Sequence, residues 1–339
     1  MRVGLIDVDG HNFPNLALMR ISAWHKAQGD VVEWHTSEGW YDIVYMSKIF
    51  SDIYSKDIPP PTNTDCVIRG GTGYCIETDE FGIEYFDKSK NNSLPPEVER
   101  MFPDYSIYPQ YNFAVSMTSR GCPRGCAFCH VADKEGRGSK KVANVSDFYC
   151  GQPEIKVLDP NITACCEKRD LFAQYREVGK PRVGAHIDFT QGLDIRLIND
   201  ADIDDINHMR IKNLHFAWDN PKDDLEQKFR DFAKAFRRNT NIGTVYCLTN
   251  FNSTLEEDLY RIYTLRDMGY WPYVMVYNKP DAPQYIRDLQ RWCNNRFAFA
   301  KAKRFEDYDP HRKGLGRSER RIPRRGGRSD RDDLRREDH

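Results

Sequence analysis

The chain has 339 residues, which is longer than one ordinary domain and favours about two. Hydrophobic residues make up 40% of it and the formal net charge is −1, so the composition is globular and indicates no strongly charged partner. No signal peptide and no apolar run of 18 residues is present, which argues against a secreted or membrane protein. We therefore expect a cytoplasmic location, where the ten cysteines are reduced thiols, metal ligands or core residues.

The first hundred residues alternate strand and helix patterns. Short apolar runs predict strands over 3–8, 31–34, 42–47 and 66–68, and helical spacing of apolar residues predicts a helix over 16–28. Strand, helix and strand in this order are typical of a parallel α/β unit, whose ligands bind at the carboxyl ends of the strands.

A second alternating series follows. Helical patterns cover 225–238 and 254–268, and the second begins with the capping box Thr254-x-x-Glu257. Six βα repeats predict a partial parallel barrel, with its site at the carboxyl ends of the strands. The predicted strands are 112–117, 155–158, 185–190, 214–218, 244–248 and 273–277.

Polar residues follow these strands. Each of them has an ordinary alternative role in capping a helix or bracing a loop. The residues just beyond strand ends include Asp159, Asn161, Gln191, Asp194, Arg196, Asp219, Asn220 and Asn250.

Three cysteines, Cys122, Cys126 and Cys129, recur at C-x3-C-x2-C spacing on a Pro/Gly loop. Iron-sulfur cubanes usually have four thiolate ligands, so three local thiolates would leave one iron open to a small molecule. A zinc site completed from a distance by Cys150 or by the 165–166 pair, a disulfide with a spare thiol, and coincidental core cysteines are the alternatives.

The stretch Thr118-Ser119-Arg120-Gly121-Cys122-Pro123-x-x-Cys126-x-Phe128-Cys129 resembles the cluster loop of the radical S-adenosylmethionine (radical SAM) enzymes. The resemblance implies a 4Fe-4S cluster on the three cysteines, S-adenosylmethionine on the open iron, and its reductive cleavage to a 5'-deoxyadenosyl radical that abstracts substrate hydrogen. It also implies a reductant protein such as a flavodoxin or ferredoxin.

By position, the resemblance assigns the backbone around Phe128 to adenine. The usual Gly-Gly-Glu element of the family is not evident at the second strand, where Leu158-Asp159-Pro160-Asn161 stands instead. Arg196 is the strongest single candidate, because a guanidinium matches a carboxylate. The residues that the resemblance assigns to ribose, carboxylate or substrate are Asp159, Asn161, Gln191, Arg196 and Asn250.

The N-terminal unit carries a second resemblance. Its elements Asp9-x-His11-x-x-Pro14, Ser47-x-Ile49 and Gly70-Gly71 are similar to the D-x-H-x-x-G, S-x-L and G-G elements of cobalamin-binding domains. This similarity implies that His11 binds cobalt, that Asp9 orients it, and that Ser47, Gly70 and Gly71 contact the cofactor. The alternative is the same architecture without cobalamin.

The remaining cysteines favour a single cluster, since Cys247 and Cys293 have core-like settings and the 165–166 pair has no further cysteine group nearby. From 310 to 339 the chain has 11 basic against 6 acidic residues and few apolar ones, which predicts disorder. Nucleic-acid binding by this tail is a weaker interpretation than a solvated tail, because acids are interspersed.

The expected fold class is α/β. It comprises a Rossmann-like cobalamin-binding-type domain (1–100), a partial (βα)6 radical SAM barrel (101–308) and an Arg-rich tail (309–339). The expected function is radical SAM chemistry on an unknown substrate. The alternatives are a cobalamin-dependent radical SAM methyltransferase and a non-enzymatic iron-sulfur or zinc-binding redox or interaction module.

Overall fold

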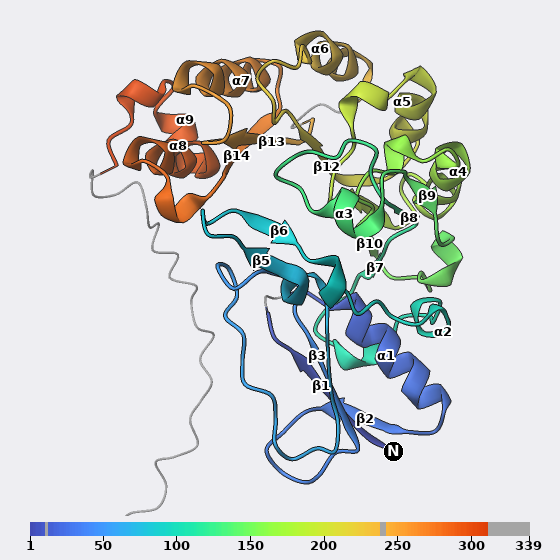
Figure 1. Ribbon diagram of the computed structural model, residues 1–339. Coiled ribbons are helices and arrows are strands. Elements are labelled where there is room, and N and C mark those ends of the chain that lie inside the picture. The colour runs from blue at the N-terminus through green and yellow to red at the C-terminus, as the bar shows by residue number, and fades with distance from the viewer. Residues whose placement is uncertain (11–12, 238–241, 311–339) are drawn as a thin grey trace, which may run out of the picture.

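The computed structural model describes residues 1–10, 13–237 and 242–310. The fold is mixed α/β and is built on two parallel sheets, one of four strands and one of six. Figure 1 shows the four-stranded sheet below the six-stranded one, with helices along the outer side of the larger sheet. Most of the predicted tail, from 311 onward, lies outside the described residues.

The four-stranded sheet has the order β2-β1-β3-β4. Its strands β1 (Arg2–Asp7), β2 (Val31–Trp34), β3 (Ile43–Ser47) and β4 (Val67–Gly70) confirm the four predicted strands within a few residues. Because β1 pairs with β2 on one side and β3 on the other, chain order reverses there, and the ends of β1 and β3 form a switch point.

Helix α1 (Leu16–Ala27) covers this sheet, as predicted. Asn15 caps it, because its side chain accepts a hydrogen bond from the backbone nitrogen of Leu18 at 3.3 Å. Leu18 and Ile21 then pack against Val3 and Leu5 of β1.

The six-stranded sheet has the order β14-β13-β12-β11-β10-β7, and every pair in it is parallel. All six predicted strands are confirmed. Their bounds are β7 (Ala114–Ser116), β10 (Glu154–Val157), β11 (His186–Phe189), β12 (Ile211–Ala217), β13 (Thr244–Thr249) and β14 (Trp271–Val276).

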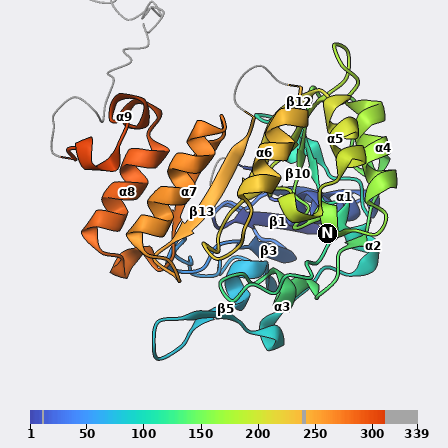
Figure 2. The ribbon, with the colours of Figure 1, turned by 90° about the horizontal axis from the view of Figure 1, so that it is seen from above.

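The helices that follow these strands lie on one face of the sheet, and Figure 2 shows them side by side across it. The predicted capping box at Thr254 and Glu257 is present at the start of α7. Helices were expected between the strands, and the two clearest patterns, 225–238 and 254–268, correspond to α6 and α7. The structure adds the bounds of α4 and α5, for which the sequence analysis named no range. The bounds are α4 (Lys168–Val178), α5 (Asp200–Asn207), α6 (Glu226–Ala235), α7 (Leu255–Asp267), α8 (Gln284–Asn294) and α9 (Arg296–Lys301).

The main core fills the space between this sheet and its helices. Alternate strand residues such as Ile155, Ile187, Phe216 and Val245 are almost completely buried there. Since strand side chains alternate between faces, the intervening residues lie on the opposite face of the sheet.

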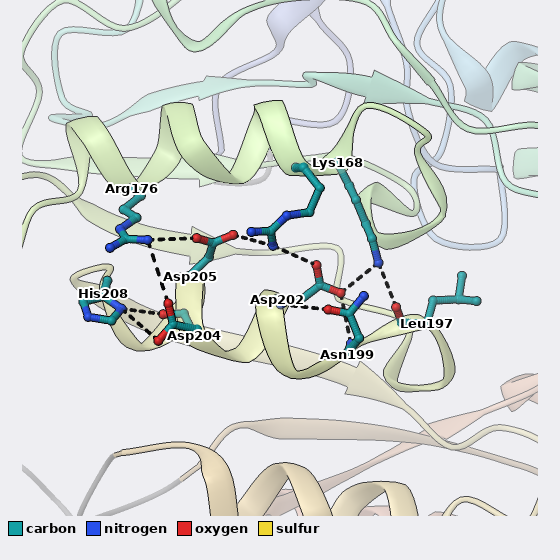
Figure 3. Close-up of polar contacts among 9 residues, drawn as sticks. Lys168, Arg176, Leu197, Asn199, Asp202, Asp204, Asp205 and His208 are labelled. Carbon is teal, nitrogen blue, oxygen red and sulfur yellow. Dashed lines mark hydrogen bonds and ion pairs between the residues drawn. The ribbon is translucent and has the colours of Figure 1, made fainter.

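Ion pairs join α4 to α5 (Figure 3). Asp202 is fully buried and accepts from Lys168 at 2.8 Å and from Arg169 at 3.4 Å. Asp205 pairs with Arg169 at 2.6 Å and with Arg176 at 3.1 Å. Several basic side chains of α4 therefore neutralise the acidic face of α5.

The two sheets meet through apolar and charged contacts. Met19 of α1, Tyr108 of the connecting segment and Val115 of β7 form one buried cluster. Arg20 donates to Glu99 at 2.5 Å and to Ser116 at 3.2 Å, so α1 is tied to the first strand of the larger sheet.

Smaller elements complete the fold. The predictions missed the hairpin of β5 (Ile76–Thr78) and β6 (Glu84–Phe86), and β8 (Ser119–Arg120) pairs with β9 (Lys140–Lys141). Two short helices are α2 (Pro96–Glu99) and α3 (Val131–Glu135). Within the described ranges, no helix is both long and apolar enough to cross a membrane.

Candidate functional site

The cysteine loop begins directly after β8 and returns through α3 to β9. Gly121 has φ +88°, and a Cβ there would lie 2.1 Å from the carbonyl oxygen of Gly138. The backbone nitrogen of Cys122 donates to the Gly136 carbonyl at 3.1 Å, and that of Cys129 donates to the Cys126 carbonyl at 3.0 Å. Only glycine at 121 allows the two arms of the loop to approach this closely.

Asp159, just beyond β10, anchors the segment that enters the loop. Its carboxylate accepts from the backbone nitrogens of Thr118 and Ser119 at 2.7 and 2.6 Å, and from both hydroxyls at 2.7 Å. Burial raises the pKa of Asp159 to about 6, although these hydrogen bonds favour the ionised form. Asp159 therefore braces the loop within the protein.

The three thiols of the loop are free and half-buried. Burial raises the pKa of Cys129, and charge on Cys126 or Cys122 would raise it further. The Asn161 side-chain amide donates to the Cys122 sulfur at 3.5 Å. Hydrogen bonds of this kind tune thiolate-held clusters.

Among the residues that the structure describes, no three His, Cys, Asp or Glu side chains are grouped around a position for one metal ion. The thiolates of a cubane bind different irons, so they need not converge on a single point. A free three-thiol set on a glycine-shaped loop is chemically suited to such a cluster.

A cavity of about 230 Å³ adjoins this loop. It lies beyond the carboxyl ends of β12 and β13, where ligand sites of parallel α/β folds are found. The residues that line it are Arg124, Cys126, Ala127, Phe128, Arg196, Ala217, Asp219, Asn220, Asp223, Phe251 and Asn252.

Two arginines and two aspartates give this cavity its polar side. Arg196 donates to Asp194 at 2.6 Å and to Asp223 at 2.8 Å, and Arg124 lies 3.5 Å from Asp223. Burial lowers the pKa of Arg196, but the hydrogen bond and charge of Asp194 and the charge of Asp223 outweigh it and raise the pKa. The Arg196 guanidinium is therefore charged and fixed in direction.

Asp219 lies at the end of β12, and burial raises its pKa to about 6. Its backbone is held by Arg261 of α7, a fully buried residue that donates to the carbonyls of Trp218, Asp219 and Leu248 at 2.5, 2.8 and 2.9 Å. Arg261 thus joins the carboxyl ends of β12 and β13 at the cavity.

The aromatic side of the cavity comes from Phe128 and Phe251, whose rings meet edge to face at 5.5 Å. Phe251 in turn contacts Tyr277, beyond β14, at 4.9 Å. The cysteine loop and the ends of two strands therefore supply a continuous aromatic surface.

The structure places the predicted residues in different positions around the loop and the strand ends. Cys126, Phe128 and Arg196 come together at the cavity, whereas Asp159 and Asn161 support the loop behind it. Gln191 is exposed and does not line the cavity. Asn250 has φ +60° and its side chain donates to the Tyr277 carbonyl at 2.8 Å, so it braces the ends of β13 and β14.

The described members of the cobalamin-like set make contacts within the protein. Asp9 accepts from the Ile49 backbone nitrogen at 2.5 Å, and the Ser47 hydroxyl accepts from Asn15 at 2.8 Å. A Cβ at Gly71 would lie 2.2 Å from the carbonyl oxygen of Lys48, whereas one at Gly70 would lie 3.6 Å from that of Asn92. The close approach at Gly71 serves the protein's own backbone. His11 lies outside the described residues.

Arg124, Asp223, Phe251 and Arg261 were not among the predicted site residues. Arg124 was visible inside the cysteine motif, and Asp258 and Arg261 share a helical face with the apolar residue Leu265. Asp223 and Phe251 had no comparable signal, because loop conformation brings them to the cavity.

No protein-family model matches the sequence, and no curated protein matches it either.

Proposed function

We propose that this chain is a radical SAM enzyme. The observation that carries the proposal is the position of the C-x3-C-x2-C loop, which borders a cavity of about 230 Å³ at the carboxyl ends of a six-stranded parallel sheet. Cys126 itself lines that cavity, so a group held by the loop would face it.

The cluster residues in this proposal are Cys122, Cys126 and Cys129. Three thiolates are the correct donors for iron, Gly121 permits the tight loop, and the Asn161 amide would neutralise part of the charge on the Cys122 sulfur. When a 4Fe-4S cluster and S-adenosylmethionine are bound, they supply one-electron cleavage of the sulfonium to a 5'-deoxyadenosyl radical, which takes a hydrogen atom from a substrate. A flavodoxin or ferredoxin would supply the electron.

The cavity residues then bind and orient the cofactor. Arg196, fixed by Asp194 and Asp223, would direct its guanidinium toward a carboxylate. Phe128 and Phe251 offer an aromatic surface for a planar base and exclude water from it. Asp219 and Asn220 add acceptors and an amide at the end of β12.

The finer architecture belongs to the same proposal. Residues 101–308 would be a partial (βα)6 barrel and residues 1–100 a cobalamin-binding-type domain. The contacts of Asp9, Ser47 and Gly71 are internal, so the described part of that set does not favour cobalamin, and we derive no step through it. Free thiols and a labile cluster suit the reducing cytoplasm.

Two cysteine variants test the cluster assignment. After anaerobic reconstitution with iron and sulfide, Cys126→Ala should lose most of the bound iron and the visible absorbance of the cluster. Cys150→Ala removes an exposed thiol outside the loop and should keep both. Equal iron in the two variants would exclude Cys126 as a ligand.

Arg196 provides a test of cofactor binding. Addition of S-adenosylmethionine should change the electron paramagnetic resonance spectrum of the reduced wild-type protein. Arg196→Leu should need a concentration at least tenfold higher for the same change, because a charged hydrogen bond contributes about 1.5–3 kcal/mol. An unchanged concentration dependence would remove Arg196 from the site.

A further inference from the structure

A row of polar and aromatic side chains occupies the face of the six-stranded sheet that is turned away from α4–α8. We call it the inner face. The strand register aligns Lys156 with Asp188 and Asn213, and aligns Ala217 with Tyr246 and Tyr273. Their neighbours in sequence, among them Ile187 and Val245, point into the helix-covered core.

His215 is at the centre of this inner face. Its Nδ1 lies 3.1 Å from the Phe189 carbonyl oxygen, which can only accept, so Nδ1 carries the proton and Nε2 of the neutral ring is an acceptor. Among the described residues Nε2 has no hydrogen-bond partner, and the side chain keeps 15% of its surface exposed.

Asp188 lies behind this ring. It is 3% exposed, and its Oδ2 accepts from Asn213 at 2.9 Å and from Lys156 at 3.3 Å. Its Oδ1 makes no hydrogen bond in the described part of the chain and lies 3.7 Å from Nδ1 of His215. A buried acceptor without a donor is costly, and a small tilt of the His215 ring would satisfy it. Asp188 is therefore close enough to His215 to position its ring.

Aromatic groups surround the ring. Tyr246 stacks on His215 with a centroid distance of 5.7 Å and an interplanar angle of 9°, and Tyr273 meets Tyr246 edge on at 5.7 Å. Tyr273 and Met275 remain 36% and 44% exposed, although they lie on an inner sheet face. Such a surface is suited to the flat side of a ring.

The charges on the inner face are balanced. Lys156 pairs with Glu154 at 2.9 Å as well as with Asp188, and Lys212 pairs with Glu154. Two cations thus offset two carboxylates. This balance favours an uncharged ligand over a phosphate or a carboxylate.

The inner face continues into the cavity. His215 and Ala217 are two residues apart on β12 and so lie on the same face of the sheet, and Ala217 lines the cavity beside the cysteine loop. At a rise of about 3.3 Å per residue, the two lie roughly 7 Å apart. A ligand held at His215 would therefore lie next to the cavity that borders the cysteine loop.

We infer that the inner face around His215 is the substrate site, and that it takes an uncharged planar ring bearing an N–H or O–H group. The Nε2 atom of His215 accepts that hydrogen, and Tyr246 and Tyr273 contact the ring. The inference names the substrate class of the proposed enzyme, and it rests on the proposed function only for what happens to the ring after binding.

The test is titration of the full chain, without added iron or cofactor, with matched ring pairs followed by ligand-observed NMR. Indole should bind about fivefold more tightly than 1-methylindole, the effect of one neutral hydrogen bond. Phenol and anisole form the O–H pair and show which donor the site prefers. Equal binding within both pairs, or no binding of any probe, would overturn the inference.

Variants of the inner face show which side chains cause the preference for the unmethylated ring. His215→Phe keeps the stack on Tyr246 but removes the acceptor, so the preference for the unmethylated ring should disappear. Asp188→Asn should weaken that preference, because the ring loses its positioning carboxylate. Tyr273→Ala should weaken the binding of both ligands of a matched pair equally, because it removes a ring contact that they share. Thermal unfolding checks that each variant is folded, and a preference that survives in folded His215→Phe contradicts the assignment.

The result is independent of the radical chemistry. A preference for the unmethylated ring without release of 5'-deoxyadenosine would contradict only the proposed function. Release of 5'-deoxyadenosine without a preference for the unmethylated ring would contradict only the inference about the substrate site.

Discussion

Replacing Arg261 with methionine should produce the largest stability loss of any single arginine at the cavity. Arg261 is fully buried on α7 and pairs with Asp258 at 2.5 Å. It also donates to three carbonyl oxygens at the ends of β12 and β13. The methionine fills a similar volume but offers no donor, so a buried carboxylate and these carbonyls lose their partner.

The expected cost follows from the burial of the pair. Removing one member of a buried ion pair costs about 3–5 kcal/mol, because the other charge stays in a medium of low dielectric constant. Burial already raises the pKa of Asp258, so part of the loss is relieved by proton uptake. We therefore expect the free energy of unfolding to fall by about 4 kcal/mol at pH 7. Under the proposed function, affinity for S-adenosylmethionine should fall too, since the backbone of Asp219 is no longer held.

Denaturation by urea, followed by circular dichroism, measures this loss. Arg230→Met is the matched control, since Arg230 pairs with Glu226 on the exposed side of α6. It should cost no more than about 0.5 kcal/mol. The double variant Arg261→Met, Asp258→Leu should recover part of the stability, because no charge is left buried. A loss below about 1 kcal/mol for Arg261→Met would refute the reasoning.

Three further outcomes are expected. Asp202→Asn, which breaks the buried centre of the α4–α5 ion pairs, should lower the unfolding free energy by about 2 kcal/mol, whereas Asp204→Asn on the exposed side should change it by less than about 0.5 kcal/mol in the same urea assay. Gly121→Ala places a Cβ 2.1 Å from the Gly138 carbonyl oxygen, so it should lower the free energy of unfolding by about 3 kcal/mol and also reduce the iron that the chain binds. In the control Gly136→Ala the new Cβ meets no atom within 4 Å, so the loss should be about 1 kcal/mol. Equal losses in the two variants would contradict the close approach at Gly121. The pKa of Asp159 is raised to about 6 in the folded state, so between about pH 4 and 6 the folded chain binds a proton that the unfolded chain releases. The stability that this group contributes therefore falls as the pH rises through that range. Asp159→Asn should flatten this fall in urea titrations at successive pH values, and an unchanged slope would argue against the raised pKa.

The strands were predictable because their residues carry the signal themselves. Runs such as 3–8 and 244–248 are apolar and end at polar or glycine residues, so they give strands with little ambiguity. The capping box at Thr254 and the spacing of Cys122, Cys126 and Cys129 are equally local. Features of this kind depend on neighbours in the chain and not on tertiary contacts.

Other features were not local. Helices α4 and α5 are held together partly by ion pairs such as Lys168 with Asp202, which join residues far apart in the sequence. Strand order likewise suggested that Asp159 and Asn250 reach a shared edge, but not where their side chains point. The hydrogen bonds to Thr118 and to the Tyr277 carbonyl turn both away from the cavity and into bracing roles.

The most direct test of the proposed function is release of 5'-deoxyadenosine. The full chain would be reconstituted anaerobically with iron and sulfide, reduced with dithionite and incubated with S-adenosylmethionine. We expect about four irons per chain and nucleoside release that disappears in Cys126→Ala but persists in Cys150→Ala. Four irons without nucleoside would contradict the enzymatic proposal, and bound zinc without iron would contradict the cluster itself.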